Sequence, residues 1–159
     1  MKKLSLIVMC AVAAFFFASC QTGVREDRNG DTPTSVVDKM YKAIQSNDYA
    51  AAAEFNKIPD TIKMKADNVY PEFKANPVVD GKVIITGDQW RAYVIERMKG
   101  ESVGYTLDSW EIVSEEISKT DPNSAKVKTK IQVTTKNGKS EAECSFPLKR
   151  ENDVWRIIG

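Results

Sequence analysis

Residues 124–149 have the sequence SAKVKTKIQVTTKNGKSEAECSFPLK, and this stretch decides the fold. From residue 125 to 133, alanine, valine, threonine and isoleucine alternate with lysine and glutamine, which is the two-residue period of a strand with one buried face. Asn137-Gly138 is a strong signal for a two-residue hairpin turn. The stretch therefore predicts two antiparallel strands with lysines on their outer face. We interpret this lysine row as solvated, with an anion-binding stripe as the alternative: Lys126, Lys128, Lys130, Lys136 and Lys139.

A turn made by Asn137 and Gly138 would also fix the register of the hairpin. It places Lys136 opposite Lys139, and every further pair follows from the turn. Pro147 then falls at a hydrogen-bonded position opposite Lys128, where its missing amide hydrogen leaves a gap, so we expect a β-bulge near Pro147. The predicted inward pairs are Val133 with Ala142, Ile131 with Cys144, Thr129 with Phe146 and Val127 with Leu148.

Further strands are predicted on either side of the hairpin. Residues 107–117 have strand-like spacing with at least one irregularity, and residues 154–158 form a last strand that turns Trp155 and Ile157 inward. We predict that Trp155 is a structural core residue. Cys144 lies in the alternating pattern too, so we interpret it as a small buried apolar residue, with a reactive thiol as the alternative.

Three helices are predicted before these strands. The first begins after Thr32, and its apolar stripe runs through residues 36–44. A short alanine-rich helix covers residues 49–55, and a third helix, capped by Asp88, covers residues 89–99 and ends at Gly100. Residues 56–85 have no clear period, and residues 83–85 fit either a short strand or the lead into a helix.

The N-terminal sequence predicts that the protein is exported from the cytoplasm. Lys2 and Lys3 precede an apolar run of about 14 residues, which is shorter than the roughly 20 that a transmembrane helix needs. The sequence Phe17-Ala18-Ser19-Cys20 resembles the lipobox of bacterial lipoproteins, in which the cysteine receives lipid and becomes the mature N-terminus. We therefore expect a signal peptide at 1–19, lipidation at Cys20, a flexible tether at 20–31 and a single domain at 32–159. An ordinary cleaved signal followed by an incidental cysteine is the alternative.

The composition excludes several kinds of chemistry. The chain has no histidine, which rules out histidine-based triads, histidine general bases and most transition-metal sites. Without Lys2 and Lys3, which leave with the signal, the 23 basic side chains fall to 21, against 22 acidic ones. This balance argues against nucleic-acid binding, which requires a basic excess on one face. We expect no catalytic residues, no metal and no cofactor.

Several stretches together carry a family resemblance: residues 36–48 with Tyr49 and the following alanines, 125–127, 136–139, 146–149 and 154–157. Their order resembles the nuclear-transport-factor-2-like (cystatin-like) α+β cone, and more closely a domain of unknown function found in small bacterial lipoproteins. The resemblance implies N-terminal helices packed on a curved antiparallel sheet, with an interior that is filled, open to a ligand or used in dimerisation. Some cone folds are isomerases or dehydratases with an acid or base in the pocket. Tyr105 and Asp108 are the suggestive pair here, and we interpret them as ordinary strand or loop residues.

Two classes of function follow. The leading hypothesis is a non-enzymatic domain, tethered to the membrane by its lipid, that binds a small ligand or an envelope protein. The alternative is a small cone-fold isomerase, dehydratase or hydrolase. Gln21 stands where aspartate marks inner-membrane retention in some bacteria, so we expect an outer-membrane lipoprotein, facing the periplasm or the exterior, and leave a homodimer open. Core packing is the simpler interpretation of four aromatic residues, which otherwise form the candidate ligand cleft: Tyr41, Trp90, Tyr93 and Trp110.

Overall fold

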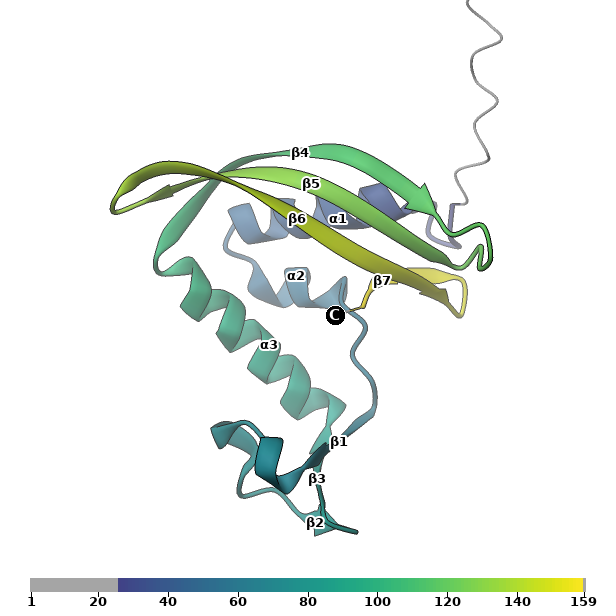
Figure 1. Cartoon of the computed structure of the whole chain (residues 1–159), viewed down its shortest axis with the longest axis vertical. Coiled ribbons are helices and arrows are strands. Elements are labelled where there is room, and N and C mark those ends of the chain that lie inside the picture. The colour runs from purple at the N-terminus through teal and green to yellow at the C-terminus, as the bar shows by residue number, and fades with distance from the viewer. Residues whose placement is uncertain (1–25, 159) are drawn as a thin grey trace, which may run out of the picture.

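The computed structural model describes residues 26–158 (Figure 1). The predicted signal peptide and Cys20 lie outside these residues. Within residues 26–158, no helix is both long enough and apolar enough to cross a membrane.

The main body is a curved antiparallel sheet that covers two helices. Its elements are α1 (Pro33–Gln45), α2 (Tyr49–Glu54), β4 (Tyr105–Ile117), β5 (Ser124–Thr135), β6 (Gly138–Glu151) and β7 (Val154–Ile157). The strands lie in the order β4-β5-β6-β7, so each pairs with the next one along the chain. Helices α1 and α2 lie beneath the concave side of the sheet (Figure 1). The α+β class predicted from the sequence is confirmed.

A smaller group of elements, here called the small lobe, extends away from the main body. It comprises β1 (Thr61–Lys65), the 3-10 turns η2 (Ala66–Asn68) and η3 (Pro71–Phe73), β2 (Val78–Val79) and β3 (Lys82–Thr86). Its three strands form an antiparallel sheet in the order β1-β3-β2. Helix α3 (Gly87–Ser102) runs from this lobe back to the main body (Figure 1). Residues 83–85, which the sequence left between strand and helix, are therefore strand.

The β5–β6 hairpin forms as predicted, but its register differs from the prediction by two residues. Lys136 and Asn137 make the turn, and Thr135 pairs with Gly138. A tight turn centred on Asn137 and Gly138 would need positive φ at both residues, whereas of the two only Gly138 has it, at 112°. Ile131 therefore lies opposite Ala142 and not opposite Cys144. Because the shift is even, each side chain keeps its predicted face of the sheet.

The bulge expected near Pro147 does not occur, because the β5–β6 pairing is continuous from residue 124 to residue 135. Pro147 lies opposite Lys126, which is a non-hydrogen-bonded position when pairs are counted from the turn. The Pro147 carbonyl points away from β5 and accepts a hydrogen bond from the amide of Ile158 at 2.9 Å. The missing amide hydrogen therefore costs no β5–β6 bond. The irregularity predicted for residues 107–117 is confirmed by two register shifts in β4, at residues 108 and 113.

Helix α3 differs from the prediction at both ends, whereas α1 begins after Thr32 as predicted. Thr86, not Asp88, is the N-cap: its hydroxyl accepts a hydrogen bond from the Gln89 amide at 3.3 Å, and the Gln89 side chain accepts one from the Thr86 amide at 2.9 Å. At the other end, the helix continues through Gly100 to Ser102. The Ser102 hydroxyl donates to the carbonyl of Lys99 at 2.7 Å and satisfies one of the free acceptors of the last turn.

Residues 26–31 belong to the folded domain, so the predicted flexible tether does not extend to residue 31. The Asp27 side chain accepts hydrogen bonds from the amides of Asn29 at 2.7 Å, Asp31 at 3.0 Å and Trp155 at 2.9 Å. The Arg28 amide donates to the carbonyl of Asp153 at 3.0 Å. The polar composition of the segment suggested nothing to bury, but Asp27 is buried, because three backbone donors compensate its carboxylate.

Two groups of buried apolar side chains hold the structure. The larger lies between α1, α2 and the main sheet and contains Trp155, which is fully buried, so its predicted core position is confirmed. The smaller lies in the small lobe and contains Phe73, Val83 and Ile85. Helix α3 contacts both, since Met98 packs against the larger group and Trp90 against the smaller. No residue of α3 is fully buried, so part of this helix faces solvent.

Candidate functional site

The four aromatic residues predicted to line one cleft are divided between the two cores. Tyr41 and Trp110 pack in the larger core, whereas Trp90 and Tyr93 pack in the smaller one. The structure therefore does not bring them into a single cleft, and each pair has different surroundings.

Tyr41 and Trp110 fill the space between α1 and the main sheet. Their rings are stacked with centroids 5.5 Å apart, and Phe146 meets the Tyr41 ring edge-on at 5.7 Å. The Tyr41 hydroxyl lies 2.9 Å from the hydroxyl of Thr129, which is itself buried. Burial raises the pKa of the Tyr41 phenol above its ordinary value. The position favours a neutral, structural tyrosine.

The polar atom of Trp110 is also satisfied inside the protein. Its indole nitrogen donates to the Asp38 carboxylate at 3.0 Å, and Asp38 forms an ion pair with Lys42 at 2.6 Å. The hydrogen bond from Lys42 holds the pKa of Asp38 below its ordinary value, against the effect of burial. With their polar groups paired, Tyr41 and Trp110 form packed core and not the wall of an open pocket.

The other pair belongs to an aromatic cluster between α3 and the small lobe. Tyr93 is at its centre, with ring centroids 5.1 Å from Tyr70, 5.3 Å from Phe73 and 5.2 Å from Trp90. Phe73 is buried, but Tyr70 is 41% exposed. The cluster therefore presents aromatic surface to solvent as well as stabilising the lobe.

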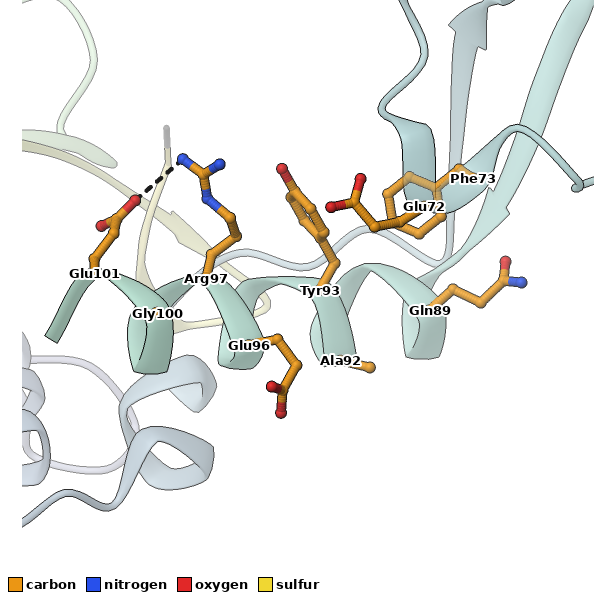
Figure 2. A pocket seen from close by; sticks show the side chains of 9 residues that line it. All are labelled: Glu72, Phe73, Gln89, Ala92, Tyr93, Glu96, Arg97, Gly100 and Glu101. Carbon is orange, nitrogen blue, oxygen red and sulfur yellow. Dashed lines mark hydrogen bonds and ion pairs between the residues drawn. The ribbon is translucent and has the colours of Figure 1, made fainter. Parts of the chain in front are cut away.

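A groove of about 650 Å³ runs along α3 beside this cluster, and we call it the α3 groove. One wall is η3, and the floor is the exposed side of α3 (Figure 2). Residues four apart on a helix share a face, which places the α3 side chains in two adjacent rows. One row is Gln89, Tyr93, Arg97 and Glu101, the other is Ala92, Glu96 and Gly100, and η3 supplies Glu72 and Phe73.

Charged side chains surround the apolar part of the α3 groove. Arg97 forms an ion pair with Glu101, one turn further along the helix, at 3.1 Å, and its guanidinium carbon lies 6.0 Å from the centroid of the Tyr93 ring (Figure 2). Glu96 forms an ion pair with Lys99 at 2.7 Å. The groove thus combines ring surface with a few fixed charges, an arrangement that binds small organic molecules in many proteins.

Tyr105 and Asp108 line a different pocket, of about 450 Å³, where α1, α2 and the end of α3 meet β4. Burial, and then the Glu101 carboxylate, raise the pKa of Tyr105 above its ordinary value. Asp108 accepts a hydrogen bond from the Thr134 hydroxyl at 2.7 Å. Tyr105 and Asp108 therefore line the same pocket, but the Asp108 carboxylate already accepts a hydrogen bond from Thr134. In the described part of the chain, no three acidic or cysteine side chains are placed to hold a metal ion.

Comparison with known proteins supports the fold. No protein-family model matches the chain, and no curated protein does. The chain is similar to a SEC-C motif containing protein from Rhodopseudomonas palustris, with 8% identity and a TM-score of 0.51 over 80% of this chain and 75% of that one. It is similar to another from Psychrobacter arcticus, with 12% identity and a TM-score of 0.51 over 87% of this chain and 63% of that one. It is also similar to an NTF-2 like protein of unknown function from Shewanella oneidensis, with 13% identity and a TM-score of 0.49 over 79% of this chain and 91% of that one. The two likenesses with a TM-score of 0.51 support the α+β fold, in which helices pack on a curved antiparallel sheet.

Only one of the predicted cleft residues, Tyr93, lines the α3 groove. Sequence reasoning missed Glu72 and Phe73, which lie in the region without a readable period. It also missed Arg97, although its spacing from Tyr93 was visible in the predicted helix, and it missed Glu101, which lay beyond the predicted end of that helix at Gly100. The spacing of charged residues around a helical aromatic residue was the available signal.

Proposed function

We propose that this protein is a lipid-anchored protein of the cell envelope whose domain binds a small, largely apolar ligand in the α3 groove and catalyses no reaction. The α3 groove is the observation that carries the proposal. Its volume of about 650 Å³ and its aromatic wall are typical of ligand pockets, which commonly have roughly 300–1,000 Å³ and few polar groups.

The packing of the main body supports binding at α3 and not inside the cone. Tyr41 and Trp110 occupy the space beneath the sheet, and their polar atoms are bonded to Thr129 and Asp38. An isomerase, dehydratase or hydrolase has less support, because the Asp108 carboxylate is engaged by Thr134 and the chain has no histidine.

The proposed anchor rests on the N-terminal sequence, from Lys2 to Cys20. Only residues 21–25 separate Cys20 from the first described residue, Glu26. Such a segment spans at most roughly 20 Å when extended. Lipid at Cys20 would therefore hold Glu26 and the adjoining part of the domain near the membrane surface.

Filling the groove tests the proposed binding. Ala92 is exposed in the groove, and Ala92→Trp places a large side chain there. Isothermal titration of the full chain in zwitterionic detergent with tryptophol, a neutral indole alcohol, should show saturable binding that this substitution weakens at least about tenfold. Ala50→Trp is the matched control, because Ala50 is an exposed helical alanine of α2 outside the groove. Absence of saturable binding, or equal binding by both variants, would contradict the proposal.

A further inference from the structure

The charged side chains of the α3 groove are mostly acidic. Glu72, Glu96 and Glu101 line it, against a single cation, Arg97. Two of the three carboxylates have cationic partners, since Glu96 pairs with Lys99 and Glu101 with Arg97. In the part of the chain that the structure describes, no basic side chain lies within ion-pair distance of Glu72. The α3 groove therefore has one carboxylate that is not compensated.

The aromatic surface beside Glu72 suits a positive charge. Glu72 directly precedes Phe73, whose ring meets Tyr93 edge-on, and Figure 2 shows the Glu72 side chain on the same side of α3 as Tyr93. The face of an aromatic ring attracts cations, and the Tyr93 ring already has the Arg97 guanidinium 6.0 Å from its centroid. An unpaired carboxylate next to aromatic rings is a combination that binds ammonium groups, because the two attractions act on the same charge.

From these contacts we propose that the α3 groove selects a small ligand that carries a positively charged amine on an apolar or aromatic body. Glu72 binds the amine, and Phe73, Tyr93 and Ala92 contact the body. This inference rests on the proposed function, because it names the ligand class for the same groove. An anionic ligand of the same shape would meet the uncompensated carboxylate of Glu72 and is disfavoured.

Three indole compounds that differ in charge test the inference. Tryptamine is a cation, tryptophol is neutral and indole-3-acetate is an anion, and all three share one ring. Isothermal titration of the full chain in zwitterionic detergent, with titrations into detergent alone subtracted, should give tryptamine the lowest Kd and indole-3-acetate the highest. The Kd should rise about threefold to tenfold from tryptamine to tryptophol, and by a similar factor from tryptophol to indole-3-acetate, which is the range expected for one partly exposed charge contact.

Glu72→Gln removes the charge and keeps the shape. Glu72 is exposed and forms no ion pair with another described residue, so this variant should fold like the parent. It should raise the Kd of tryptamine to that of tryptophol and leave tryptophol unchanged. Glu111→Gln is the control, because it removes an equal charge from an exposed position on the outer face of β4, and should change neither Kd.

The outcomes separate this inference from the proposed function. Equal Kd values for the three compounds, with binding still lost in Ala92→Trp, would overturn the inference and leave the groove a binding site. No saturable binding of any compound would overturn the proposed function itself. Displacement of tryptophol by a lysine-rich peptide, together with no binding of tryptamine, would overturn the assignment to a small ligand. A loss of tryptamine affinity that is equal in Glu72→Gln and Glu111→Gln would show that the effect is net charge and would overturn the role of Glu72.

Discussion

The side chain of Asp27 accepts a hydrogen bond from the backbone amide of Trp155, at 2.9 Å, and this contact joins the N-terminal turn to the last strand. The other carboxylate oxygen of Asp27 accepts bonds from the amides of Asn29 and Asp31. The residue is 7% exposed. Asp27 thus ties the N-terminal turn of the described chain to the main body.

We predict that Asp27→Asn destabilises the protein by about 1–3 kcal/mol. An asparagine can keep one oxygen toward Asn29 and Asp31, but its amide group then faces the Trp155 amide, so two donors meet where a donor and an acceptor met. Chemical denaturation of the full chain measures the loss. Asp67→Asn, at an exposed position in η2, is the control and should be nearly neutral. Equal stability of the two variants would contradict the role of Asp27.

The same contact predicts a pH dependence. Burial alone would raise the pKa of Asp27, but the hydrogen bonds from Trp155, Asp31 and Asn29 outweigh burial and hold the pKa below its ordinary value of 3.8. A carboxyl with a lowered folded-state pKa contributes stability that is present above its unfolded value and is lost as pH falls through the folded value. We expect the thermal unfolding midpoint to decrease as the pH is lowered below about 4, and we expect this decrease to be less steep in Asp27→Asn. An equal dependence of the unfolding midpoint on pH in parent and variant would contradict this role of Asp27.

The sequence predicted the hairpin well because its signals are local. The alternation over residues 125–133 placed Val127 and Val133 inward and Lys128 outward, as observed. The turn position was wrong, because the Asn-Gly pattern does not determine which residue takes the positive φ, and Gly138 takes it alone of the two. The error of two residues left the faces intact, since side chains alternate with a period of two.

The α3 groove could not be predicted to the same extent, because its walls come from separate segments. Glu72 and Phe73 of η3 meet α3 only when the small lobe folds, and they lie in a region without a readable sequence period. The aromatic character of Trp90 and Tyr93 was visible, but an aromatic residue packs equally well in a core or a groove. Only the tertiary contacts show that these two residues belong to a different cluster from Tyr41 and Trp110.

Lipidation at Cys20 is predicted from the sequence before it. Cys20→Ala should block both lipid addition and processing by the lipoprotein-specific peptidase, so the protein should keep residues 1–19 and lack the lipid mass. Mass spectrometry and detergent partitioning measure both effects. Cys10→Ala is the matched control, because Cys10 lies within the predicted signal and its loss should not change the mature mass. A Cys20→Ala protein with unchanged processing and partitioning would contradict the anchor.

The last prediction is that Trp155 holds the main body together. It is fully buried in the larger core, and the Arg150 guanidinium carbon lies 5.9 Å from the centroid of its ring. Truncating such a residue to alanine typically costs about 3–5 kcal/mol, a large share of the roughly 5–15 kcal/mol that keeps a domain folded. The unfolding midpoint of Trp155→Ala should therefore fall by roughly 10–20 °C.

The control for Trp155→Ala is Val103→Ala, because Val103 is 88% exposed and its truncation should leave the midpoint nearly unchanged. A tryptophan that contacted a ligand at a pocket mouth would behave differently from a core residue, since its loss would weaken binding and leave most of the stability. Thermal unfolding of the Trp155→Ala variant separates these two roles. A midpoint within about 3 °C of the parent would contradict the core role, because a change that small corresponds to only about 1 kcal/mol in a domain of this size.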